Sequence, residues 1–141
     1  MPTLEDAILL AVQAHHGQLE KNGQPYILHP LRVMFRLEHE HERMAAVLHD
    51  VVEDTPHTLD DLRARGYPPE VVAAVDCLTR RPTETYEEFI ERAAVDHIAR
   101  RVKLADLEDN MDIRRLTSFA ANDADRMRKY LIAWRALTGP A

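Results

Sequence analysis

Residues 44–54 read MAAVLHDVVED, and this stretch decides the kind of fold that the chain adopts. Its apolar residues share one arc of a helical wheel, which predicts a helix facing a core: Met44, Val47, Leu48 and Val51. A second arc carries the polar residues His49, Asp50, Glu53 and Asp54. Three carboxylates without a Lys or Arg repel one another there. A divalent cation would relieve this repulsion, while a solvated acidic face is the alternative, and the residues alone leave both open.

Helical spacing recurs along the rest of the chain, where glycine is scarce and alternating strand patterns are hard to find. We expect eight helices, at about residues 4–12, 30–39, 42–53, 58–66, 68–78, 83–95, 98–114 and 123–137. The last helix is expected to bury a stripe of Met127, Tyr130, Leu131, Trp134 and Leu137. The prediction is an all-α, single-domain orthogonal helical bundle over residues 1–141.

Charge and composition narrow the classes of partner. The formal net charge is −6 and no run of Lys and Arg occurs, so we expect no nucleic-acid polymer as partner. A small phosphorylated substrate remains possible, because a local field can oppose the global one. The single cysteine, Cys77, allows no disulfide within the chain, and no signal-like or membrane-spanning apolar run occurs. These features predict a cytoplasmic protein without a membrane partner.

Three strings together resemble the HD-type phosphohydrolases: GQPYILHP (23–30), LHDVVEDT (48–55) and VKLADLEDN (102–110). In detail they are similar to the hydrolase domain of RelA/SpoT-type stringent-response enzymes and their small stand-alone relatives. The strings occur in the order of that family, and the match covers nearly the whole chain. The resemblance implies a helical bundle of the HD type and a metal-dependent phosphohydrolase. It further implies the guanosine 3′,5′-bis(diphosphate), or (p)ppGpp, 3′-pyrophosphohydrolase reaction.

The resemblance also implies roles for individual residues. The metal ligands of the family fall on His29, His49, Asp50 and Asp106, and the ion is usually Mn²⁺. The pair that orients and deprotonates the attacking water falls on Glu53 and Asp54. Taken alone, His29 between prolines would be a structural histidine, and Asp106 would be one half of a surface ion pair with Lys103.

Substrate contacts are expected from a further group of residues: Lys21, Lys103, Asn110 and Tyr130. The resemblance supplies Asn110 and Tyr130, whereas the two lysines are chosen because they can balance phosphate charge. Arg80 and Arg81 are weaker candidates for the same task, since surface arginines are common. His15 is expected to be structural or to line a pocket.

Glu20 departs from the family, which commonly has a basic residue at this position. A carboxylate there would repel a polyphosphate or forgo stacking on a purine. Another phosphorylated nucleotide is therefore an alternative substrate. A non-catalytic, metal-containing nucleotide-binding module is a second alternative, and a helical module without a metal is a third. A homo-oligomer also remains open.

Overall fold

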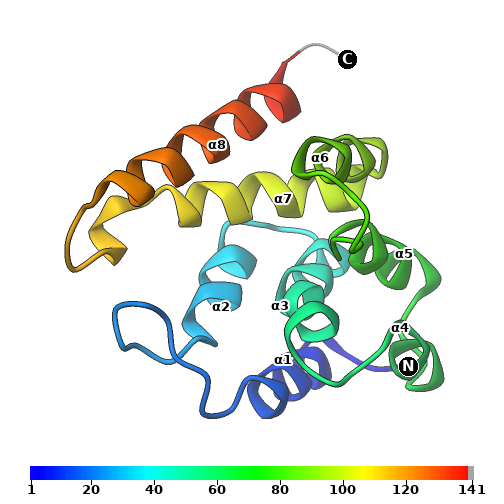
Figure 1. The fold of residues 1–141 in the computed structure, drawn as a ribbon. Helices are drawn as coiled ribbons and strands as arrows, with labels where there is room; N and C mark the ends of the chain where they lie inside the picture. Colours follow the sequence, from blue (N-terminus) through cyan, green and yellow to red (C-terminus); the bar gives the residue numbers. More distant parts are fainter. Residues whose placement is uncertain (140–141) are drawn as a thin grey trace.

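The computed structural model describes residues 1–139, which form eight α-helices and one short 3-10 helix (Figure 1). These are α1 (Leu4–Ala14), α2 (Leu28–Phe35), α3 (Glu40–Asp54), α4 (Leu59–Ala64), α5 (Pro69–Cys77), α6 (Tyr86–Val95), α7 (His97–Asn110), η1 (Ile113–Arg115) and α8 (Ala121–Thr138). The only strand-like pairing within residues 1–139 is an isolated bridge between Leu19 and Pro25. The all-α prediction is confirmed.

Helix α3 lies at the centre and packs against α1, α2, α5 and α7. Its predicted apolar arc is buried, with Val47, Leu48 and Val51 fully inaccessible to solvent. Burial of each such side chain contributes about 1.5–3 kcal/mol to folding. The polar arc, one turn away, is therefore held at a fixed position on the edge of the core.

A smaller core joins α6, α7 and α8 on the other side of the molecule (Figure 1). Ile90, Leu107, Ala133 and Leu137 form its buried centre. Leu131 was expected there, but its side chain is 44% exposed, so that part of the predicted stripe is wrong. The small Ala133 lies at the helix contact instead, and a larger residue is not needed there to fill the space.

Helix α7 ends at Asn110 rather than near Arg114, which corrects another sequence prediction. The chain turns at Met111, and the side chain of Asp112 accepts a hydrogen bond from the backbone N–H of Arg114 at 3.1 Å. This cap starts the 3-10 helix η1 in place of a further α-helical turn. The break directs Arg115 back toward the interior of the molecule.

Backbone hydrogen bonds and two glycines fix the conformation of the loop between α1 and α2. Gly17 and Gly23 have φ values of +84° and +85°, which favour glycine. The backbone N–H of Tyr26 donates to the Gln18 carbonyl at 2.8 Å, and that of Glu20 donates to the Gln24 carbonyl at 2.7 Å. This segment, residues 17–26, is called the α1–α2 loop below.

No helix within residues 1–139 combines the length and the apolar character that crossing a membrane requires.

Candidate functional site

Three helices bring the four expected metal-ligating side chains together. His29 comes from α2, His49 and Asp50 from α3, and Asp106 from α7. One ligand atom from each of His29, His49 and Asp50 lies within 4.8 Å of the others. Oδ1 of Asp106 lies 2.8 Å from Nε2 of His29 and 3.4 Å from Nε2 of His49. The convergence expected from the sequence is thus present, and the role of these residues as ligands stays a prediction.

Both imidazoles use Nδ1 to donate a hydrogen bond, which leaves Nε2 for another task. Nδ1 of His49 lies 2.5 Å from the carbonyl oxygen of Ala46, which can only accept. Nδ1 of His29 lies 2.6 Å from Oδ2 of Asp109, and hydrogen bonds outweigh burial to hold the pKa of that carboxyl at about 2. In a neutral imidazole each Nε2 therefore directs a lone pair toward the same group of carboxylate oxygens.

Such an arrangement needs a positive charge between the imidazoles and the carboxylates. Burial opposes protonation of His49, but Asp50 and Asp106 reverse this and raise its pKa well above the usual value. The buried Nε2 of His49 also lacks a hydrogen-bond partner within residues 1–139. A divalent cation would replace the proton, and two nitrogens with two carboxylates form a donor set suited to Mn, Fe, Zn or Mg. The residues present therefore fit a metal ion.

Two residues that the sequence analysis did not single out hold two of the expected ligand side chains in place. The hydroxyl of Tyr26 donates a short hydrogen bond to Oδ2 of Asp50. Asp109, which is 1% exposed, orients His29 through the bond described above. Outer carboxylates of this kind fix the tautomer of a ligating histidine. The sequence could have pointed to both residues, because Tyr26 and Asp109 lie inside the strings that resemble the family.

Lys103 and Asn110 both contact Asp106. Nζ of Lys103 lies 2.8 Å from Oδ2, and Nδ2 of Asn110 lies 3.3 Å from Oδ1. The lysine is only 9% exposed, so the alternative of an ordinary surface ion pair is wrong. Burial alone would lower the pKa of Lys103, but Asp106 and Tyr86 raise it overall, which keeps the amine charged.

Glu53 and Asp54 extend from the end of α3 to the edge of the site and are exposed. Partial burial and the neighbouring carboxylates Asp50 and Asp54 raise the pKa of Glu53 to about 6. A carboxylate with a pKa near neutrality is suited to general-base work. Glu53 lines the cavity beside the expected metal ligands, whereas Asp54 lies outside that lining.

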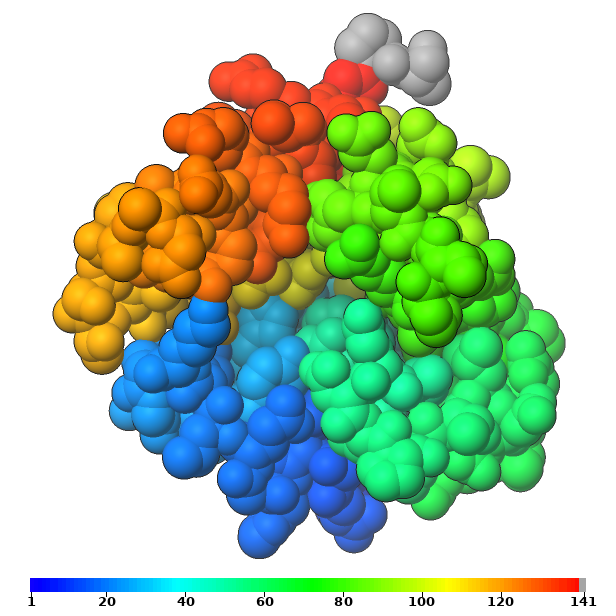
Figure 2. Space-filling view, in the orientation of Figure 1, coloured from blue at the N-terminus to red at the C-terminus, as the bar shows by residue number. Residues whose placement is uncertain are grey.

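A hollow on one face of the molecule lies between α6 and α8 on one side and α3 and the α1–α2 loop on the other (Figure 2). It contains two cavities. The first, of about 240 Å³ and called the metal-side cavity below, is lined by His29, Asp50, Glu53, Lys103 and Asp106, among others. The second, of about 260 Å³, is lined by Lys21 and other residues of the loop and is called the loop-side cavity. Asn110 and Tyr130 line both cavities, which makes the two neighbours.

The remaining expected residues are placed as follows. Arg80 lines the metal-side cavity. Arg81 lines neither cavity and lies 3.8 Å from Asp76. His15 is 2% exposed and its ring centre lies 5.0 Å from that of Tyr26, in agreement with a structural role.

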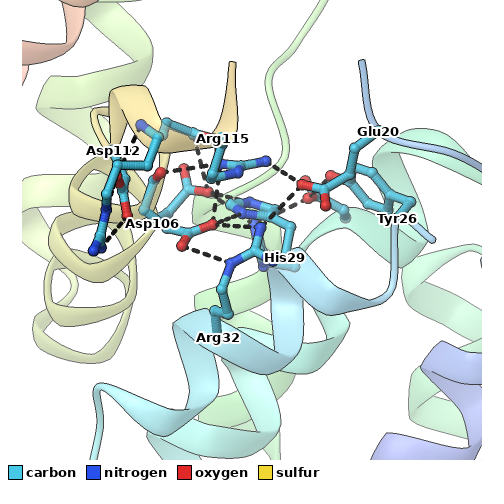
Figure 3. Close-up of polar contacts among 12 residues, drawn as sticks. Glu20, Tyr26, His29, Arg32, Asp106, Asp112 and Arg115 are labelled. Carbon is cyan, nitrogen blue, oxygen red and sulfur yellow. Dashed lines mark hydrogen bonds and ion pairs between the residues drawn. The ribbon is translucent and has the colours of Figure 1, made fainter. Parts of the chain in front are cut away.

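Glu20 is not the free carboxylate that the sequence suggested. Its side chain is 4% exposed, and it accepts a hydrogen bond at 3.0 Å from Arg32 and a shorter one from Arg115 (Figure 3). Arg32 and Arg115 also pair with Asp109, at 2.8 and 3.0 Å. Two guanidinium groups thus balance two carboxylates, and the expected repulsion of a polyphosphate by Glu20 is offset within the protein.

Comparison with known proteins gives relatives that are named as (p)ppGpp 3′-pyrophosphohydrolases, as a (p)ppGpp synthase/hydrolase or as GTP pyrophosphokinases. The chain is 36% identical over 135 residues to the guanosine-3′,5′-bis(diphosphate) 3′-pyrophosphohydrolase of Haemophilus influenzae, which covers 86% of this chain and 20% of that protein. It is 36% identical over 123 residues to the bifunctional (p)ppGpp synthase/hydrolase SpoT of Escherichia coli, covering 77% of this chain and 17% of that protein. The chain therefore spans about a fifth of the length of these curated relatives. No protein-family model matches it.

A solved structure agrees with these relatives over almost the whole chain. It is that of a metazoan ortholog of SpoT that hydrolyses ppGpp, and it superposes with a TM-score of 0.80 at 26% sequence identity. The match covers 99% of this chain and 88% of that one.

Fold and site together define the class: an all-helical protein with a buried His–Asp centre of a size to hold a divalent metal ion. Within that class, the chain is homologous to the SpoT-type (p)ppGpp 3′-pyrophosphohydrolases. The resemblance inferred from the three sequence strings is confirmed.

Proposed function

We propose that this protein removes the 3′-pyrophosphate from (p)ppGpp, with one divalent cation held by His29, His49, Asp50 and Asp106. One observation carries the proposal. Nε2 of His29 and Nε2 of His49 both point at the buried carboxylate of Asp106, beside a cavity. The homologues named as hydrolases of this nucleotide support the choice of substrate. Mn²⁺ as the ion and the cytoplasm as the location are parts of the same proposal.

The bound cation would supply Lewis-acid stabilisation of phosphoryl charge and a lowered pKa for water. Glu53, which lines the cavity and has a raised pKa, accepts a proton from the attacking water. Asp54 helps to orient this water from the next position on α3. The water oxygen bonds to the phosphorus next to the ribose, and the bond from that phosphorus to the ribose 3′-oxygen breaks. The proton taken by Glu53 balances the one that the 3′-oxygen gains.

The other expected contacts surround this reaction centre. Lys103 brings a buried positive charge to the metal-side cavity, and Asn110 and Tyr130 stand at its junction with the loop-side cavity. Lys21 lines the loop-side cavity, and this position supports its proposed contact with the rest of the nucleotide. A small phosphorylated nucleotide is thus the proposed partner.

Two of the alternatives lose their main support in the geometry. The case for a different nucleotide depended on a repulsive Glu20, whose charge is balanced by Arg32 and Arg115. A module that only binds a nucleotide has no need of a carboxylate with the raised pKa of Glu53.

The direct test is incubation of the purified protein with ppGpp and a panel of nucleotide phosphates, with and without Mn²⁺, followed by identification of the products. We expect GDP and inorganic pyrophosphate from ppGpp, only with the metal. Release of orthophosphate, turnover of another nucleotide in preference to ppGpp, or tight binding without any product would contradict the proposal.

A further inference from the structure

The metal-side cavity has three lining residues that the reaction scheme above leaves unused: Arg80, Tyr86 and Lys129. Together with Lys103, they form the cationic end of this cavity. Nζ of Lys129 lies 4.4 Å from the centre of the Tyr86 ring, and Cζ of Arg80 lies 5.8 Å from the same centre. One aromatic ring therefore holds two cations close together, by attraction to its π face.

These cations lack the carboxylate partners that surround the other arginines of the cleft. Within the described part of the chain, Arg80 donates only to the backbone carbonyl of Glu84, at 3.4 Å, and Lys129 forms no ion pair. Partial burial, followed by the charges of Arg80 and Lys103, lowers the pKa of Lys129. Like charges thus gather at one end of a cavity in a protein whose net charge is negative. An anion bound there would relieve their repulsion.

A second observation points to a ligand at the same place. The hydroxyl of Tyr86 is buried and has no hydrogen-bond partner within residues 1–139. A buried hydroxyl without a hydrogen-bond partner destabilises the protein. A phosphate oxygen that accepts a hydrogen bond from this hydroxyl would remove the penalty. The ring that holds the two cations therefore also offers a directional donor.

Lys103 links this cationic end to the metal centre. Its Nζ lies 2.8 Å from Oδ2 of Asp106 and 5.0 Å from the centre of the Phe89 ring, and its charge acts on Lys129. Both ends belong to one cavity of about 240 Å³, so a short ligand can span them. A diphosphate has this form, with one phosphorus at the metal and the other at the cations.

We propose that Arg80, Lys129 and the hydroxyl of Tyr86 form a subsite for the distal phosphate of the 3′-diphosphate, and hence for one half of the pyrophosphate product. The inference rests on the proposed function, since it assumes that the proximal phosphate lies at the metal centre. It assigns the 5′-diphosphate elsewhere, toward Lys21 in the loop-side cavity.

Two neighbouring residues of α8 give a matched pair of variants. Lys129→Met removes a cation that lines the metal-side cavity, whereas Arg128→Met removes one that pairs with Asp125 at 3.0 Å and lies outside this cavity. The probes are inorganic pyrophosphate, orthophosphate and GDP. Their affinities are measured by calorimetry on metal-loaded protein after free metal has been removed.

We expect Lys129→Met to weaken pyrophosphate binding about tenfold, as loss of a charged hydrogen-bond donor predicts. Orthophosphate and GDP should bind as to the wild type, and Arg128→Met should change none of the three affinities. Tyr86→Phe removes only the hydroxyl and should weaken pyrophosphate binding roughly threefold. This second variant keeps the test available if Lys129→Met fails to fold.

The subsite is refuted if Lys129→Met and Tyr86→Phe leave pyrophosphate binding unchanged, weaken all three ligands equally, or weaken GDP alone. The last result would place the 5′-diphosphate at these cations. Binding is measured without turnover, so the two proposals can fail separately. A protein that fails to hydrolyse ppGpp but loses pyrophosphate affinity in both variants would refute the proposed function and leave only a pyrophosphate-binding site at these residues.

Discussion

Two clusters of buried charge meet at Asp109, and they are balanced in different ways. On the loop side, Glu20 and Asp109 are matched by two guanidinium groups, those of Arg32 and Arg115. On the metal side, Asp50 and Asp106 share one ammonium group, that of Lys103, with two imidazoles whose charge depends on protonation. The charges of the first cluster balance within the protein, whereas the second requires a cation or protons from outside.

The difference distinguishes charges that stabilise the fold from charges that are available to bind a ligand. A charge-balanced set of ion pairs holds the α1–α2 loop against α2 and η1. In the metal-side cluster, lone pairs and negative charge stay available to a ligand. Leaving these charges unbalanced costs folding free energy, which a bound ion would recover. We therefore expect substitutions in the two clusters to have opposite signatures, large on activity in one and large on stability in the other.

The largest effect is expected from Asp50→Asn. The variant should lose bound metal and at least about 100-fold in turnover, because even outer-sphere changes at metal sites cost 10–100-fold. Elemental analysis and the rate of GDP formation measure the two losses. Asp60→Asn, at an exposed aspartate on α4 that pairs with Arg63, is the control and should change neither. Full metal retention by Asp50→Asn would remove Asp50 from the ligand set.

A somewhat smaller loss is expected from Glu53→Gln, which should keep the metal and lose turnover by about 100-fold, as removal of a general base does. The proposed mechanism requires Glu53 to be ionised, so kcat of the wild type should fall as the pH drops through the pKa of that residue, about 6. Glu53→Gln should lack this dependence, provided that metal content is followed at each pH.

The exposed Glu38→Gln should keep both the rate and the pH profile of the wild type. An unchanged rate in Glu53→Gln would show that the water loses its proton to another group.

The smallest effect on chemistry, and the largest on stability, is expected from Arg115→Ala. It leaves Glu20 with Arg32 alone, and we expect unfolding in urea to show a loss of about 2 kcal/mol, less than full disruption of a buried pair. Adding Glu20→Gln should recover part of that loss, because the uncompensated charge is gone.

The matched control is the adjacent Arg114→Ala, whose side chain is 87% exposed; it should cost less than about 0.5 kcal/mol. Equal losses for the two arginine variants would show that the ion pairs of Arg115 do not stabilise the fold.

The metal-side cluster was predictable from the sequence because its geometry is largely local. His49 and Asp50 are neighbours on one helix, and Lys103, Asp106 and Asn110 follow helical spacing on another. The family strings then supplied His29. The apolar arc of α3 was predictable for the same reason, since a period of 3.6 residues fixes which side chains face the core.

The loop-side cluster was not predictable in this way. Glu20 and Arg115 are 95 positions apart, and no local pattern reveals that they meet. The partnership also depends on the break of α7 after Asn110, which the sequence analysis placed four residues later. On α8, both apolar and small residues compete for the contact, so the pattern alone overestimated the burial of Leu131.

The charge balance of the loop-side cluster has a consequence for exchanging segments between this protein and its relatives. Glu20 draws its counter-charges from positions 12 and 95 residues away, so the segment that carries it is not an independent cassette. A chimera that installs the common basic residue at position 20 would add a third cation beside Arg32 and Arg115 and remove one of the two carboxylates that balance them. Any such graft must therefore exchange residues 32 and 115 together with the loop.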